Sequence, residues 1–119
     1  MPMPEWIAEW IRKDRLVQNK YKISRKYLRH KKRIQFQEGE RKENSEEWAW
    51  FKYVVISTKY GKYWVRFTDG LYECNCPFFK HRGICSHILG VAQLTEVWPD
   101  KETIFPSKEA TTDNSPKKD

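Results

Sequence analysis

All three cysteines of the 119-residue chain lie, together with His87, within fourteen residues. They form the pattern Cys74-Asn75-Cys76, an eight-residue gap, and then Cys85-Ser86-His87. Residues two apart on an extended strand project to the same side, and a side chain at a helix cap can converge with one in the first turn. Three thiolates and one imidazole suit a tetrahedral zinc ion and leave no position for substrate water. The sequence therefore predicts one structural zinc ion held by Cys74, Cys76, Cys85 and His87.

Two other interpretations of the cysteines are weaker. Free cysteines can be small buried hydrophobic residues, but here every cysteine belongs to the same Cys-x-Cys and Cys-x-His pattern. Cys85 and His87 could form a nucleophile and base pair, yet no orienting acid or oxyanion feature accompanies them. An odd number of cysteines cannot pair completely, and a reducing compartment opposes disulfides. We therefore expect no catalytic residue and no enzymatic activity, with His81 exposed in the gap.

The hydrophobic pattern predicts an α+β fold. We expect a small zinc-stabilised domain that contains a three- to four-stranded antiparallel sheet and a C-terminal helix. One or two short basic N-terminal helices precede this domain. Apolar residues at helical spacing predict a first helix over residues 4–18, and Ser24 is a good N-cap for a second, shorter one. Alternation predicts a strand over residues 33–37, a hairpin over 48–67 with a turn at Gly61, and an extended segment over 71–76. Helical spacing returns over residues 85–97.

Composition divides the chain into three segments. Residues 1–46 form a basic helical segment with a short strand and an acidic loop over 38–47; residues 47–98 form the zinc finger domain; residues 99–119 form a tail expected to be disordered. The longest apolar run is four residues, whereas a bilayer needs about 20. The N-terminus also lacks the layout of a secretory signal. We expect a protein that is not secreted and has no membrane partner, located in the cytoplasm (nucleoid-associated) or nucleus.

Residues 50–94 resemble the SWIM zinc finger, whose pattern is C-x-C, a variable gap and C-x-H, after a β-hairpin and before a helix. The resemblance assigns Cys74, Cys76, Cys85 and His87 as the four ligands and places Pro77 at the proline that commonly follows the second cysteine. Val55–Ser57 and Tyr63–Val65 match the hairpin positions, and Lys26-Tyr27 with the strand near Ile34 is similar to the lead-in of small bacterial and archaeal stand-alone members. Two departures are Gly90, where members usually carry alanine, and Gly83-Ile84, where they often carry proline.

The resemblance implies binding of DNA or of another protein. Family members occur in Mutator-type transposases, beside helicase-like ATPases, in a ubiquitin-ligase-like kinase and as partners of recombinase paralogues. An interaction adaptor for a recombinase-like ATPase, docking through the aromatic hairpin or the Trp6 and Trp10 face, is therefore one alternative. An accessory fragment of a transposase is another, although no acidic catalytic triad is evident.

Charge favours nucleic acid as the partner. The net charge is +7, and residues 12–33 contain eleven Lys and Arg against Asp14 alone, whereas residues 38–47 carry −3. Such a run exceeds what solubility requires and would displace counterions from a phosphate backbone. The amino-acid sequence predicts binding of nucleic acid with little base-sequence preference, and DNA is the expected kind of nucleic acid. The expected phosphate contacts are Arg25, Lys26, Arg29, Lys31, Lys32, Arg33, Lys80 and Arg82.

Overall fold

Four antiparallel strands form one sheet in the order β1-β2-β3-β4. The computed structural model describes residues 3–57, 59 and 61–105. The strands are β1 (Ile34–Arg41), β2 (Trp48–Ser57), β3 (Gly61–Thr68) and β4 (Leu71–Cys74). Val55 of β2 lies opposite Ile34 of β1 and Tyr63 of β3, which fixes the register of the central strand. The predicted hairpin and the α+β fold class are confirmed.

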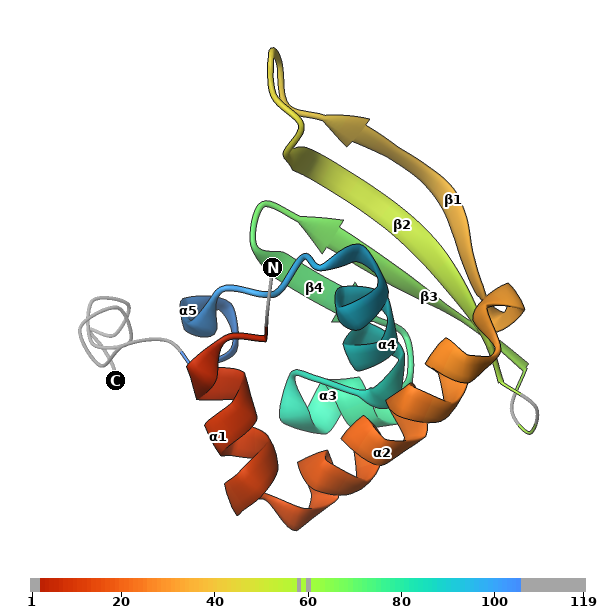
Figure 1. Cartoon of the computed structure of the whole chain (residues 1–119), viewed down its shortest axis with the longest axis vertical. Helices are drawn as coiled ribbons and strands as arrows, with labels where there is room; N and C mark the ends of the chain where they lie inside the picture. The colour runs from red at the N-terminus through yellow and green to blue at the C-terminus, as the bar shows by residue number, and fades with distance from the viewer. Residues whose placement is uncertain (1–2, 58, 60, 106–119) are drawn as a thin grey trace, which may run out of the picture.

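Helices precede and follow the sheet (Figure 1). The chain begins with α1 (Glu5–Lys13), α2 (Arg15–Arg29) and a short 3-10 turn, η1 (Lys31–Arg33). After the sheet come α3 (Pro77–Arg82), α4 (Ser86–Thr95) and α5 (Lys101–Ile104). None of these described helices combines the length and hydrophobicity needed to cross a bilayer.

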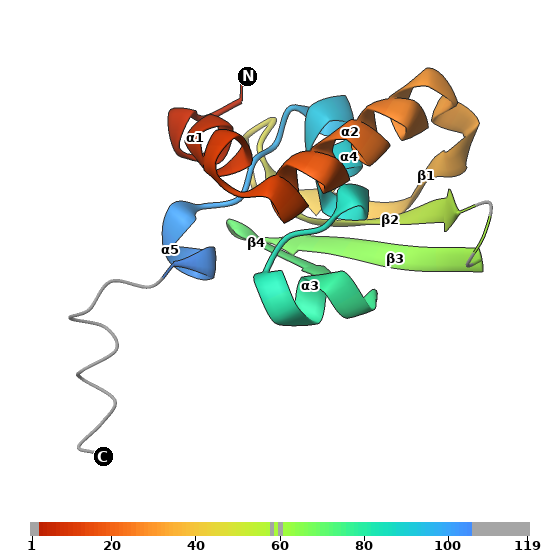
Figure 2. The ribbon, with the colours of Figure 1, turned by 90° about the horizontal axis from the view of Figure 1, so that it is seen from below.

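The core lies between the sheet and the helices α1, α2 and α4, which gather on one side of it (Figure 2). Phe51, Val55 and Val65 of the sheet are fully buried, as are Ile7 of α1 and Val17 of α2. Alternation produces this arrangement, because in β4 Tyr72 and Cys74 are buried whereas Leu71 and Glu73 are exposed. Residues before and after the expected boundary between residues 46 and 47 therefore belong to one hydrophobic core.

Helix α4 is buried on nearly all sides. Every residue from Ser86 to Ala92 is buried, because α2 packs on one side of the helix while β3 and β4 lie on the other. A helix that is apolar all round is typical of such a central position. Polar bonds fix the α2 contact, since Nε2 of Gln93 donates to the buried Ser24 hydroxyl at 2.8 Å and Nη1 of Arg25 donates to Oε1 of Gln93 at 2.9 Å.

The predicted N-terminal helices have the wrong boundaries. The expected helix over residues 4–18 breaks at Asp14, whose extended backbone ends α1 and whose carboxylate caps α2 by accepting the N–H groups of Leu16 and Val17. Ser24 is not an N-cap, because it lies within α2 and its hydroxyl donates to the Tyr21 carbonyl oxygen at 2.6 Å. Asp14 is itself a good N-cap residue, so the sequence does contain the signal for the break.

Two segments expected to lack structure are partly ordered. The acidic loop over 38–47 is shorter than predicted, because β1 continues to Arg41 and Gly39 lies opposite Phe51. The tail predicted over 99–119 contains α5, and the N–H of Asp100 donates to the Gly70 carbonyl oxygen at 2.9 Å. Phe105 packs edge-on against Trp10, with ring centroids 4.7 Å apart. Residues 106–119 lie outside the described part of the chain.

Gly90→Ala should stabilise the protein. Gly90 lies within α4, and a Cβ built there would be 3.6 Å from Cδ1 of Ile34 and 3.9 Å from Cβ of Tyr27, which is ordinary van der Waals contact. Alanine removes a helix-interior glycine that costs about 1 kcal/mol. We expect thermal melting of the zinc-loaded protein about 4–8 °C higher.

The matched control is Gly83→Ala. Gly83 ends α3 with φ of +78°, a left-handed conformation that alanine adopts at a cost. This variant should melt at a lower temperature than the wild type. A lower melting temperature for Gly90→Ala would contradict the packing described for α4.

Candidate metal centre

The first pair of cysteines comes from the end of the sheet. Cys74 closes β4 opposite Val65 of β3, and Cys76 follows with an extended backbone at φ −83° and ψ 153° before α3 begins. The two thiols therefore lie on the same side of the chain. Asn75 points the other way, and its Oδ1 accepts the N–H of Trp64 at 3.0 Å. This bond ties the Cys-x-Cys segment to β3.

The second pair comes from the start of α4. Cys85 is the N-cap residue, with an extended backbone, and its sulfur accepts the N–H of Ile88 at 3.4 Å. His87 lies in the first turn of the same helix. A cysteine can serve as the cap here because its sulfur accepts one of the N–H groups that the first helical turn leaves unpaired. The helix start thus places a sulfur and an imidazole side by side.

The four side chains meet at one point. Their ligand atoms all lie within 4.8 Å of one another, and all four residues are buried. Sγ of Cys74 is 3.7 Å from Nδ1 of His87. A tetrahedral zinc ion with Zn–S near 2.3 Å and Zn–N near 2.0–2.1 Å requires a sulfur–nitrogen separation of about 3.6 Å. The residues therefore fit zinc in donor chemistry and in spacing, as the sequence predicted.

The thiols perturb one another's protonation. Hydrogen bonding to Cys76 raises the pKa of Cys74 to about 12, and burial raises the pKa of Cys85 well above its ordinary value. The pKa of Cys76 is lowered, because the side chains of Cys74 and then Cys85 bond to its thiolate. Ionisation of Cys74 and Cys85 is therefore opposed in this buried cluster, whereas ionisation of Cys76 is favoured. Zinc binding must displace the remaining protons, so acid opposes it.

A comparison with known protein families identifies this segment. Residues 63–96 match the family model of the SWIM zinc finger. The segment is a SWIM zinc finger. No curated protein and no solved structure matches the chain. The four residues of the SWIM pattern are those that the fold brings together, and they are grouped for one metal ion, consistent with one zinc.

The gap of the SWIM finger is a helix, which the sequence analysis missed. Pro77 stands at the first position of α3 and Gly83 follows it in the left-handed conformation. Proline at a helix start and glycine just past its end are the usual signals, so the gap did carry a helix signature. Helix α3 begins directly after Cys76, and His81 is exposed on it, as expected.

Three of the predicted phosphate contacts also bond to other parts of the fold. Arg25 lies on the flank of α2 that faces α4, and Arg33 donates from Nη1 to the Ile56 carbonyl oxygen at 3.2 Å. Arg82 is paired with the Asp14 carboxylate. These three arginines hold parts of the fold together. The remaining predicted contacts are exposed: Lys26, Arg29, Lys31, Lys32 and Lys80.

Two adjoining hollows run along α2 beside the SWIM finger, and we call them together the α2 groove. They share Ile23, Lys26 and Tyr27. The larger, of about 780 Å³, reaches Cys76, Cys85 and His87 and is also lined by Lys20, Lys59, Tyr63 and Phe78; the smaller, of about 390 Å³, continues to Arg29, His30 and Arg33. Within the described part of the chain, no Asp or Glu lines either hollow. Sequence reasoning missed Lys20 and Lys59 as members of this site.

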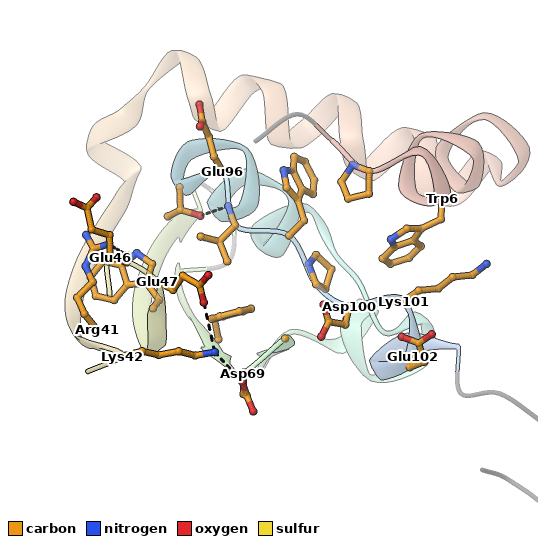
Figure 3. Close-up of a pocket in the computed structure, with 18 residues that line it drawn as sticks. Trp6, Arg41, Lys42, Glu46, Glu47, Asp69, Glu96, Asp100, Lys101 and Glu102 are labelled. Carbon is orange, nitrogen blue, oxygen red and sulfur yellow. Dashed lines mark hydrogen bonds and ion pairs between the residues drawn. The ribbon is translucent and has the colours of Figure 1, made fainter. Parts of the chain in front are cut away.

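A third hollow, of about 610 Å³, has the opposite character. Figure 3 shows its labelled side chains coming from α1, the β1–β2 connection, the β3–β4 turn and the chain from Glu96 to α5. Acidic residues outnumber basic ones there, and Nζ of Lys42 lies 3.5 Å from Asp69 and 3.8 Å from Glu47. Among the described residues, the four SWIM ligands are the group that could hold a metal, and no carboxylates gather in a comparable way.

Proposed function

We propose that the chain is a non-enzymatic zinc-finger module that binds nucleic acid, with DNA as the favoured kind, through the basic surface of α2 and η1. The proposed location is the cytoplasm or the nucleus. The observation that carries the proposal is the charge of residues 12–33, eleven Lys and Arg against one acid. Helix α2 and η1 present much of this charge to solvent. Phosphates are its natural complement, because neutralising them releases condensed counterions.

Fewer side chains are available to contact phosphate than the basic segment contains. Lys26, Arg29, Lys31 and Lys32 are exposed, and none of them has an ion-pair partner among the residues that the structure describes. Lys22, on the flank of α2 near Arg29, is exposed as well. With Lys80 on α3, about six cations remain for phosphate. The zinc ion supplies a rigid cross-link between sheet and helix, with no open position for hydrolysis.

The test is a salt titration of a fluorescent, mixed-sequence DNA with the zinc-loaded protein. About six phosphate contacts predict a loss of affinity for duplex DNA of roughly a thousandfold between about 50 and 200 mM salt. The same titration with chelator present should show weaker binding. Binding that does not change with salt, or no binding at low salt, would reject the proposal.

An interaction adaptor for a recombinase-like or other DNA-processing partner remains the second candidate. Trp64 on β3 is 37% exposed and lies on the face of the sheet opposite to that of its buried neighbour Val65, which favours a docking surface on that outer face. The Trp6 and Trp10 face is less suited to docking, because Phe105 packs against both rings. A stoichiometric protein complex that survives nuclease and about 0.5 M salt, which screens exposed charges, would favour the adaptor. A transposase accessory role has no structural observation in its favour.

A further inference from the structure

The α2 groove combines positive charge with aromatic walls. Nζ of Lys20 lies 4.7 Å from the ring centroid of Phe78, and Tyr27 stands at the junction of the two hollows. Lys26 and Lys59 are exposed at the rim. Proteins that bind single-stranded nucleic acid pair a basic groove that follows the backbone with rings on which bases stack. The groove has both elements in one place.

The dimensions of the groove suit a short single strand. Lys20 and Arg29 are nine residues apart on α2, which is about 14 Å at 1.5 Å per residue. One strand advances about 3.4 Å along the helix axis per phosphate when stacked as in B-DNA and further when unstacked, so at most about four phosphates fit along this length. The larger hollow, of about 780 Å³, is within the range of small-molecule pockets and therefore has room for a base.

Only an unpaired base can use this hollow. In a duplex the bases face inward and stack on one another, so the backbone alone would meet the lysines. A base that turns away from its neighbours could enter beside Phe78 and Tyr27 while its phosphates stay at the rim. Tyr27 and Tyr63 line the hollow beside the metal centre, where their ring centroids lie 5.9 Å and 4.5 Å from that of His87.

We infer that the α2 groove binds single-stranded nucleic acid, with phosphates on Lys20, Lys26 and Lys59 and an unpaired base against Phe78 and Tyr27. This inference rests on the proposed function and adds the strand state and the location. It replaces Arg25, which bonds to Gln93 of α4, with the residues of α2 that line the hollow beside the metal centre. It also gives Lys20 and Lys59 a role that the sequence analysis did not assign.

The experiment compares one labelled oligonucleotide as a single strand and as a blunt duplex, at the same salt, with the zinc-loaded full chain. Base stacking on protein rings changes affinity by about 5- to 150-fold per base, so the single strand should bind at least about tenfold more tightly. Phe78→Leu should weaken single-strand binding by about tenfold, and Phe78→Tyr should restore it. Lys26→Gln should weaken it by about fivefold at about 100 mM salt and lower the salt slope by about 0.7.

The controls make the same chemical changes elsewhere. Phe36→Leu removes an exposed ring on β1, and Lys101→Gln removes a charge in the acidic hollow of Figure 3; both should bind like the wild type. Zinc content and melting temperature are measured for every variant, so that a folding defect is recognised.

Three outcomes would overturn the inference in different ways. If neither strand form binds, the proposed function fails as well. If the duplex binds as tightly as the single strand, or if Phe78→Leu behaves like Phe36→Leu, nucleic-acid binding stands but the groove assignment is wrong. If polyglutamate of the same length displaces the strand as efficiently as unlabelled single strand does, the groove serves an acidic protein segment instead.

Discussion

His87→Ala should abolish stoichiometric zinc binding and unfold the SWIM finger. His87 is buried and its Nδ1 lies in the cluster of four ligand atoms. Structural zinc contributes about 10–16 kcal/mol of apparent binding free energy in finger peptides at neutral pH, which equals or exceeds the stability of a typical domain. We expect loss of the cooperative melting transition and of the near-ultraviolet circular dichroism, measured with metal analysis of the same samples.

The chain provides matched controls for this experiment. His30→Ala and His81→Ala remove the two exposed histidines, and both variants should retain one zinc ion and the wild-type melting curve. A chelator added to the wild type should reproduce the His87→Ala result, and added zinc should reverse it. Because zinc competes with protons for the thiols, a fall in pH should also release the ion. Zinc-free protein with an unchanged melting curve would show that the four residues do not hold the fold together.

Asp14→Ala should lower the free energy of unfolding by about 2 kcal/mol. The Asp14 carboxylate caps α2 by accepting the N–H of Leu16 at 3.0 Å and that of Val17 at 3.3 Å, and loss of such a cap costs about 1 kcal/mol. The same carboxylate pairs with Arg82 of α3, and its side chain is only 20% exposed. Loss of this partly shielded pair adds a similar amount, because Arg82 is left without its partner. Denaturation of the zinc-loaded protein measures the sum.

Two further variants separate the two contributions of Asp14, the helix cap and the ion pair with Arg82. Asp14→Asn retains an acceptor for the cap but loses the charge, so it should cost about half as much as alanine, and Arg82→Gln should cost about the same as Asp14→Asn. In the double variant the two losses should not add, because both remove one interaction. Full additivity would show that the ion pair does not stabilise the protein.

The pH dependence of the Asp14 contribution has a defined sign. Partial burial raises the pKa of Asp14, but the Val17 N–H, the Arg82 charge and the Leu16 N–H together lower it below its ordinary value. A lowered folded pKa means that the stabilisation is fully present above the unfolded value of about 3.9 and is lost only as pH falls through the folded value. The difference between the wild type and Asp14→Asn should therefore stay constant between about pH 5.5 and 7.5. A decrease within that range would contradict this assignment.

The metal centre could be predicted from the sequence because ligand spacing and backbone geometry act locally. Cys74 and Cys76 are placed by strand alternation, and Cys85 and His87 by a helix start, so each pair depends on a few neighbouring residues. The sheet was predictable for the same reason, since Tyr63, Val65 and Phe67 alternate with polar or exposed positions. Tertiary contacts were needed only to bring the two pairs together, and the Cys-x-Cys and Cys-x-His pattern implied that step.

The basic surface could not be predicted as well, because its geometry depends on how helices pack. Charge along residues 12–33 identifies a basic segment, but nothing local shows that Arg25 turns toward Gln93 of α4 or that Arg82 reaches Asp14, 68 residues earlier. Lys59, in the turn between β2 and β3, joins the groove only through the fold. The break at Asp14 and helix α3 differ from these cases. Their signals are local, because Asp14 is a good N-cap residue and Pro77 and Gly83 are typical of a helix start and a helix end.

The ring cluster of Trp6, Trp10 and Phe105 joins the first and last helices of the described chain. The Trp6 and Phe105 centroids are 6.3 Å apart, and Figure 1 shows the start of α1 close to α5. Neighbouring ends are the usual condition for circular permutation. A short linker from residue 105 to residue 3, with new ends opened in the exposed connection between β1 and β2, should yield a polypeptide that folds around the same four ligands.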